Sequence, residues 1–315
     1  MIDDVAANLF RILVFPGLVF TLALGLFASW LVRKVSALVQ YRVGPPLLQP
    51  AWDVLKLMGK EVLIPSEAQK TVFICAPLVG MAGVLLLSTM LWRIAIRPSE
   101  VFVGDVIVAV YLMVLPSLAL ILGGSSSASP HAAVGSSREM KLVLGYELPL
   151  VLALIVVIIK SGGVLDLAVI SQRAPIASVS GFLAFVVALL CVQAKLGFVP
   201  FDIAESETEL AGGVIIEYSG VLLAIWKMVQ AMMLVALPLF LVMTFLGGFG
   251  ATAGTWIWGA VKYVIVVVLV ILIKNTNPRV KIDQAMRFFW VYCTVLTAWA
   301  VLLASVGNRY GLAWL

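Results

Sequence analysis

The chain has 315 residues and a net charge of +5, and 63% of its residues are hydrophobic while only 12% are charged. Soluble domains are rarely more than half apolar, so this composition excludes them and indicates an integral membrane protein. The basic excess does not require nucleic acid as a partner, because loops that flank membrane spans carry such charge.

Eight apolar segments are expected to cross the bilayer, which requires about 20 apolar residues for each helix. The fifth is short, and we expect it to extend through Gln193 to Gly197. An even number of spans places both termini on one side. The pattern predicts an all-α integral membrane protein in which residues 1–315 form a single membrane domain. The expected spans are residues 12–32, 72–92, 104–122, 142–159, 179–192, 221–245, 256–273 and 288–306.

Lys and Arg are distributed unevenly between the two sides of this topology. The loops after the odd-numbered spans contain thirteen of them: Arg33, Lys34, Arg42, Lys56, Lys60, Lys70, Arg138, Lys141, Lys195, Lys274, Arg279, Lys281 and Arg287. The other side contains six: Arg11, Arg93, Arg97, Lys160, Arg173 and Arg309. The side richer in Lys and Arg is normally cytoplasmic. We therefore expect a multi-pass protein of the cell membrane with both termini extracytoplasmic.

The first expected cytoplasmic loop, residues 33–70, contains a turn followed by an amphipathic segment. Gly44, Pro45 and Pro46 interrupt any helix and favour a rigid turn. After Pro50 the apolar and charged residues alternate in a pattern typical of a short helix on the membrane surface. The pattern alone does not decide whether this helix stabilises the fold or contacts a partner. Its residues are Trp52, Asp53, Leu55, Lys56, Leu57, Met58 and Lys60.

The next expected cytoplasmic loop, residues 123–141, is rich in Gly and Ser and is interpreted as a linker or as a loop held by a partner. Arg138 and Glu139 precede the fourth span, and Glu147 lies within it beside Tyr146. A glutamate at this depth is expected to hold a proton near neutral pH or to belong to a static pair. Lys227 in the sixth span is interpreted as a matching group of the same path, or as a lysine that extends to the membrane interface or belongs to a static buried pair.

Residues 198–220 contain five of the 16 acidic residues of the chain, Asp202, Glu205, Glu207, Glu209 and Glu217. Asp202 and Glu205 have the spacing of a capping box at a helix start. On a continuous helix all except Glu207 would share one face, within about 120° of one another, whereas Gly212 and Gly213 are residues that can break this register. Like charges so close repel, and we expect some of these carboxyls to hold protons at neutral pH, as a proton relay requires.

Cys75, Cys191 and Cys293 are isolated from one another within apolar segments. The sequence contains no CxxC motif, Cys/His pair, dinucleotide fingerprint or phosphate-binding loop. We therefore expect that the chain binds no metal or cofactor and has no catalytic residue of its own.

Three motifs occur in order along the chain: Arg42-Val-Gly-Pro-Pro-Leu-Leu-Gln-Pro; Ser136-Ser-Arg-Glu followed by Tyr146-Glu147; and Pro200-Phe-Asp-Ile-Ala-Glu-Ser-Glu-Thr-Glu-Leu followed by Glu217-Tyr-Ser-Gly. Together they resemble the subunit 1 family of respiratory complex I, the NADH-quinone oxidoreductase. The loops are more compact than is typical of complex I members. They are most similar to the membrane anchor subunit of group 4 membrane-bound nickel–iron hydrogenases, of the energy-converting and formate-hydrogenlyase types. The sulfane sulfur reductase complexes are also close.

The resemblance implies a non-catalytic anchor and coupling subunit of a redox-driven proton or sodium pump. It implies contacts with a hydrogenase- or complex I-like large subunit and an iron–sulfur small subunit on the cytoplasmic side, and with antiporter-like membrane subunits. The partners would hold the iron–sulfur clusters and the nickel–iron site. The implied proton path comprises Glu139, Glu147, Asp202, Glu205, Glu207, Glu209, Glu217 and Lys227. The implied partner interface comprises Arg42, Gly44, Pro45, Pro46, Gln49, Asp53, Lys56, Arg138 and Phe201.

Two alternatives remain open at this point. A quinone-site subunit of complex I would have a quinone-sized cavity under the first loop. A stand-alone ion transporter would often show inverted repeats, and none is visible in the sequence.

Overall fold

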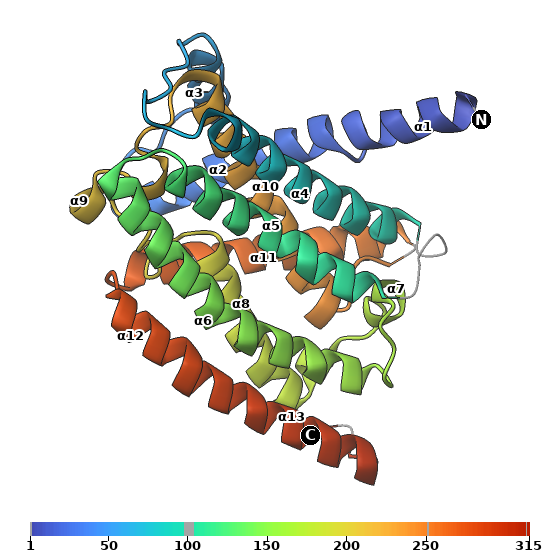
Figure 1. Ribbon diagram of the computed structural model, residues 1–315. Helices are drawn as coiled ribbons and strands as arrows, with labels where there is room; N and C mark the ends of the chain where they lie inside the picture. The colour runs from blue at the N-terminus through green and yellow to red at the C-terminus, as the bar shows by residue number, and fades with distance from the viewer. Residues whose placement is uncertain (1, 98–103, 251, 313) are drawn as a thin grey trace.

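The computed structural model describes residues 2–97, 104–250, 252–312 and 314–315, except for the side chains of residues 2–7, 207 and 208. All regular secondary structure in the described ranges is helical, as expected (Figure 1). Its elements are α1 (Ile2–Leu13), α2 (Leu18–Val39), α3 (Gln49–Met58), α4 (Lys70–Ile96), α5 (Asp105–Ser125), α6 (Pro130–Lys160), α7 (Leu167–Ile170), η1 (Pro175–Ala177), α8 (Val179–Lys195), α9 (Glu207–Leu210), η2 (Gly213–Ile215), α10 (Gly220–Phe245), α11 (Ala253–Thr276), α12 (Ile282–Arg287), the π-helical segment η3 (Phe288–Cys293) and α13 (Thr294–Tyr310).

The described ranges contain seven helices that are long and apolar enough to cross a membrane, and α8 is a shorter apolar helix at the position of the expected fifth span. The short amphipathic helix expected in the first loop is present as α3. These elements confirm the predicted all-α membrane architecture.

The bundle has one end that collects most of the polar connections. Residues 40–69, 126–129, 196–219 and 277–281 connect helices there, and we call it the polar end. In Figure 1 it is the left-hand end, where α3, α9 and α12 lie. Both termini lie at the opposite end of the bundle.

The centre of the bundle is α10, in which every residue from Ala231 to Phe245 is buried. Helices α2, α4, α8 and α11 pack around it, while α6 packs against α5, α8 and α13. The outer helices α11 and α13 expose many large apolar side chains, as helices in contact with lipid do. The molecule therefore has a buried, apolar central helix and a periphery of helices exposed to lipid.

Much of the segment expected as a flexible loop before the fourth span is helical. Helix α6 begins at Pro130, and the preceding Ser129 is in an extended conformation. Proline is tolerated in the first turn of a helix, because the backbone N–H groups there have no partner within the helix. Arg138 and Glu139 are consequently fixed on a helix. Gly135 lets this helix approach residues 204–214 closely, because an added Cβ would lie 2.8 Å from the Val214 nitrogen.

Residues 202–217 do not form one continuous helix, and the interruption includes Gly212 and Gly213. The only helical pieces there are α9, with four residues, and η2, with three. Ala211, Gly212 and Gly213 have positive φ angles, which end any regular helix between the two pieces. Asp202 is not a helix cap, because α9 begins five residues later, at Glu207. The carboxylates of this acidic segment, residues 202–217, do not share a helix face.

Candidate functional site

An ion pair lies inside the bundle between α8 and α6. The Lys195 ammonium, at the last residue of α8, donates to the Glu147 carboxylate in the middle of α6. The Lys195 side chain is fully buried and that of Glu147 is 22% exposed. The Lys195 Nζ atom also lies 4.8 Å from the centre of the Tyr146 ring, within the range of a cation–π interaction. The cation thus has two partners on α6.

Glu139 lies two turns before Glu147 on α6 and is buried. It lines a small cavity of about 60 Å³ together with Ser117, Lys195 and other polar residues. A cavity of this size holds a few water molecules, since one water requires roughly 10–15 Å³ of such volume. The Ser117 hydroxyl, on the cavity wall, is 3.3 Å from the Tyr146 hydroxyl, and the Tyr146 ring contacts Lys195 of the ion pair. Proton-carrying groups from α5, α6 and α8 therefore meet in one place.

Glu205 lies on the other side of this cavity, where the acidic segment meets α10. The Gln230 amide donates to both of its carboxylate oxygens, at 3.1 and 2.9 Å. Removal from water raises the pKa of the Glu205 carboxyl. Lys227 opposes this shift, Asp202 adds to it, and the hydrogen bond from Gln230 opposes it. The protonated form of Glu205 is thus favoured more than that of an exposed glutamate.

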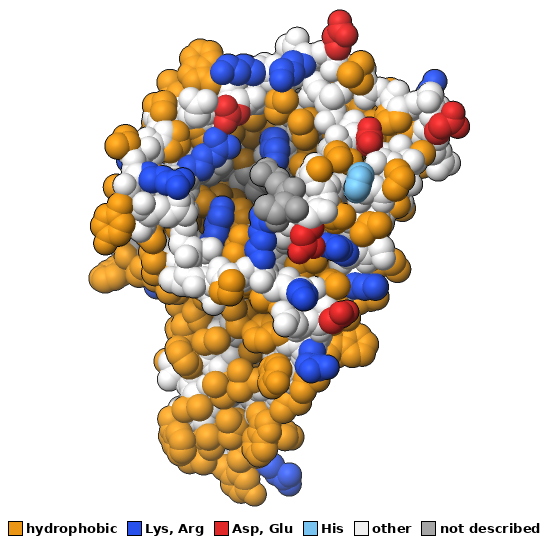
Figure 2. Space-filling model, turned by 90° about the vertical axis from the view of Figure 1, so that its left-hand side faces the viewer, with side chains coloured by type: hydrophobic (Ala, Val, Ile, Leu, Met, Phe, Trp, Pro, Cys, Tyr) orange, Lys and Arg blue, Asp and Glu red, His pale blue; other side chains and the backbone are white. Residues whose placement is uncertain are grey.

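A larger cavity, of about 550 Å³, opens at the polar end. Figure 2 shows Lys and Arg side chains gathered around a hollow on this face. It shares Asp202, Glu205 and Gln230 with the small cavity, so the two are contiguous. The charged lining residues are Arg33, Asp53, Asp202, Glu205, Lys227, Lys274 and Arg279.

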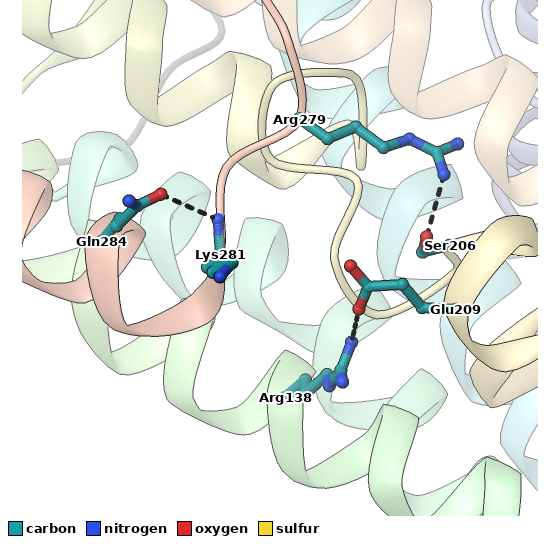
Figure 3. A network of polar contacts seen from close by, with 6 residues as sticks. All are labelled: Arg138, Ser206, Glu209, Arg279, Lys281 and Gln284. Atoms are coloured by element: carbon teal, nitrogen blue, oxygen red, sulfur yellow. Dashed lines mark hydrogen bonds and ion pairs between the residues drawn. The ribbon is translucent and has the colours of Figure 1, made fainter.

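The acidic segment is fixed by arginines from two other parts of the chain (Figure 3). Arg279, in the connection after α11, binds the Asp202 carboxylate at 2.9 Å and the Ser206 hydroxyl at 2.8 Å. Arg138 on α6 binds the Glu209 carboxylate at 2.5 Å. These long-range contacts determine the conformation of the segment in place of helical hydrogen bonds.

Several residues expected in the proton path lie away from the Lys195–Glu147 pair and the two cavities. Glu209 is exposed and pairs with Arg138. Glu217 is half-buried, lines neither cavity, and forms no ion pair within the described part of the chain. The side chain of Glu207 is outside the described residues. The expected residues that the structure brings together are Glu139, Glu147, Asp202, Glu205 and Lys227.

The expected partner-interface residues other than Arg138 and Phe201 fall into three groups. Arg42, Pro46 and Lys56 are exposed at the polar end. The side chains of Gln49 and Asp53 are bound within the chain, because Asp53 accepts a hydrogen bond from Gln49 at 3.0 Å and pairs with Arg33 of α2 at 2.7 Å. The half-exposed Gly44 and Pro45 pack toward α2, where Trp30 donates to the Pro45 carbonyl at 3.1 Å.

The assignment of Phe201 to a partner interface is not supported. This side chain is only 3% exposed, and its ring centre lies 4.7 Å from that of Phe289. It belongs to the aromatic core below the acidic segment, so it offers almost no surface to another chain.

Sequence reasoning missed the role of Lys195, because it counted this residue among the loop cations although it expected the span to extend to Gly197. Gln193 and Lys195 continue α8 with their side chains buried. A lysine directly after an apolar span and seven residues before Asp202 is the one signal that could have identified it. In the described ranges, no group of three or more His, Cys, Asp or Glu residues is arranged to hold a metal ion.

Comparison with known proteins relates this arrangement to one family. The family model described as NADH dehydrogenase matches residues 11–305. The H subunit of the NADH-quinone oxidoreductase from Anoxybacillus flavithermus is 34% identical over 82% of this chain and 81% of its own. The corresponding subunit from Thermomicrobium roseum is 32% identical over 92% and 93%, respectively.

One solved structure is similar over nearly the whole fold. It is a chain of the membrane-bound sulfane sulfur reductase, an archaeal respiratory membrane complex. The TM-score is 0.85 and the sequence identity 26%, over 95% of this chain and 99% of that chain. Since the family model covers nearly all of the sequence, this protein belongs to the NADH dehydrogenase family, the family of complex I subunit 1.

Proposed function

We propose that this protein is the membrane anchor and coupling subunit of a multisubunit redox-driven ion pump. Membership in the complex I subunit 1 family and the similarity to a respiratory membrane complex support this role. The protein moves charge through its own carboxyls, while partner subunits perform the redox chemistry. A group 4 hydrogenase-type complex fits the compact loops best.

The observation that carries the proposal is the buried Lys195–Glu147 pair beside the buried Glu139, in contact with the cavities at the polar end. Charged groups so deep in a membrane bundle are costly, and they usually mark a path for protons or ions. The proposed route runs from Asp202 and Glu205 through Glu139 to the Lys195–Glu147 pair. Protonation of one carboxyl changes the field at the next, which links a redox event at the polar end to the centre of the bundle.

The polar end is the cytoplasmic side in this proposal, because the loops there carry most of the Lys and Arg residues. The large subunit and the iron–sulfur small subunit dock on that end. Antiporter-like membrane subunits bind the flank of the bundle and receive the signal. The larger cavity lies beside Pro50, Val54 and Leu57 of the first loop, so it also meets the expectation stated for a quinone-site subunit. Its seven charged lining residues favour a hydrated charge path over the mostly apolar lining of a quinone pocket.

The test replaces Glu139 or Glu147 by Gln in the assembled complex, which keeps side-chain size and removes the change of charge. We expect ion uptake into vesicles and coupled substrate turnover to fall together, while a native gel shows an intact complex. Glu217→Gln is the matched control and should retain pumping, because this carboxyl belongs to the same segment, lines neither cavity and forms no ion pair among the described residues. Full pumping by both intact variants would contradict the proposal.

A further inference from the structure

A second large cavity, of about 600 Å³, lies between α11 and the α12–η3 segment and is separate from the proposed charge route. Its floor is apolar and includes Leu190 of α8 and Phe201, and Ile273 and Phe288 form its sides. Helix α11 packs on α2 and α10, whereas α12 and η3 pack on α6, and the cleft lies where these two groups of elements separate. Its volume lies in the range of about 300–1,000 Å³ usual for small-molecule sites.

The cleft opens at the level of the lipid head groups. Trp290 and Tyr292 in η3 are 55% and 64% exposed, and aromatic residues of this kind gather at membrane interfaces. From η3 to the end of α13 the helix has six and then 17 residues, a length of about 34 Å at 1.5 Å per residue. Such a helix crosses the whole hydrocarbon layer. Arg287, immediately before η3, is therefore at the polar boundary of the membrane.

Arg287 provides a cation at the mouth of the cleft. It lines the cavity, is exposed, and forms no ion pair among the residues that the structure describes. Asp283, one turn earlier on α12, also lines the mouth. The Gln284 side chain is engaged, since it accepts a hydrogen bond from the backbone of Lys281 at 3.3 Å. A guanidinium with its donors available is suited to bind a phosphate through two parallel hydrogen bonds.

We propose that this cleft binds one membrane phospholipid, with its phosphate on Arg287 and a hydrocarbon chain along the apolar floor. The site thus combines an apolar chain channel with a cationic head-group contact at the correct depth. The bound lipid fills the space between α11 and the α12–η3 segment and supports the connection whose Arg279 holds Asp202. This inference concerns lipid binding and does not depend on the proposed charge route.

The first test measures lipid retained by the purified complex with mass spectrometry after extensive detergent washing. We expect about one tightly held phospholipid for each complex, and roughly tenfold weaker retention in Arg287→Gln, because a charge-assisted contact is lost. Arg309→Gln, at the other end of α13 and away from the cleft, is the control and should retain lipid. Excess inorganic phosphate should not displace the lipid, since phosphate alone lacks the chain.

A second test uses the unmodified complex, so it does not depend on how a variant folds. A photoreactive phospholipid with its reactive group in the acyl chain should cross-link to Leu190, Ile273 or Phe288, which line the cleft. Equal lipid retention by Arg287→Gln and the unmodified complex would overturn the proposal. So would cross-linking elsewhere only, displacement by phosphate, or a partner helix occupying the cleft in the assembled complex.

Discussion

Two ion pairs of this protein join similar groups in different surroundings. Lys195 and Glu147 meet inside the bundle, where the lysine side chain has no exposure to solvent. Arg33 and Asp53 meet at the polar end, with 46% and 39% of their side chains exposed. The outer pair holds α3 against α2, whereas the inner pair occupies a region in which an isolated charge has no solvent to stabilise it.

The difference shows where a change of charge alters the free energy of this molecule most. An exposed pair gains little free energy, because water already stabilises both charges. In a buried pair, loss of one partner leaves the other uncompensated in low-dielectric surroundings. A change of protonation near the inner pair therefore has large consequences, while the same change near the outer pair has small ones.

Removal of the inner cation should have the largest effect. Lys195→Ala leaves Glu147 unpaired, at a cost of roughly 3–5 kcal/mol in the free energy of unfolding, and we expect poor assembly of the complex. Native gels and thermal unfolding in detergent would measure it. The double variant Lys195→Met, Glu147→Leu removes both charges, so it should assemble better than Lys195→Ala and still fail to pump. Normal stability of Lys195→Ala would show that the pair is not truly buried.

The close contact between α6 and the acidic segment gives the next largest effect. Gly135→Ala places a Cβ 2.8 Å from the Val214 nitrogen and 3.0 Å from the Ala204 carbonyl oxygen, which forces one of the two backbones to move. Overpacking of this kind costs about 1–3 kcal/mol. Gly254→Ala on α11 is the control, since no atom lies within 4 Å of its added Cβ. Equal melting temperatures for the two variants would contradict the packing described.

The raised pKa of Glu205 predicts a pH dependence of intermediate size. Because its pKa in the folded protein is above the unfolded value, its contribution to stability is fully present below the unfolded pKa. That contribution is lost as the pH rises through the folded pKa. Glu205→Gln lacks this titration, so the unmodified protein should lose melting temperature relative to the variant on going from acid to neutral pH. Parallel curves for the two proteins would refute the assignment.

The outer pair should give the smallest effect. Arg33→Gln removes a contact worth roughly 0–1 kcal/mol, and high salt should reduce the difference further. The hydrogen bond from Arg33 is the main cause that lowers the pKa of Asp53. A lowered pKa gives stability that is present above the unfolded pKa and is lost as the pH falls through the folded value. A loss as large as that of Lys195→Ala would remove the contrast between the two pairs.

Sequence alone predicted the spans, the amphipathic helix and the family, because hydropathy runs and local motifs determine them. It did not identify Lys195 as the partner of Glu147, because the two residues are 48 positions apart in the sequence. It also misjudged the acidic segment. Gly212 and Gly213 are a local signal for the break in that segment, but its contacts with the distant Arg279 and Arg138 cannot be derived from any local pattern.

The central claim is that the buried carboxyls change protonation when the complex turns over. Redox-induced infrared difference spectroscopy of the purified complex measures this directly, because protonated carboxyl groups absorb apart from carboxylates. We expect a carboxyl band that changes on reduction and is absent in the intact Glu139→Gln complex, and that is retained in Glu217→Gln. An unchanged difference spectrum in Glu139→Gln, with normal ion uptake, would contradict the account.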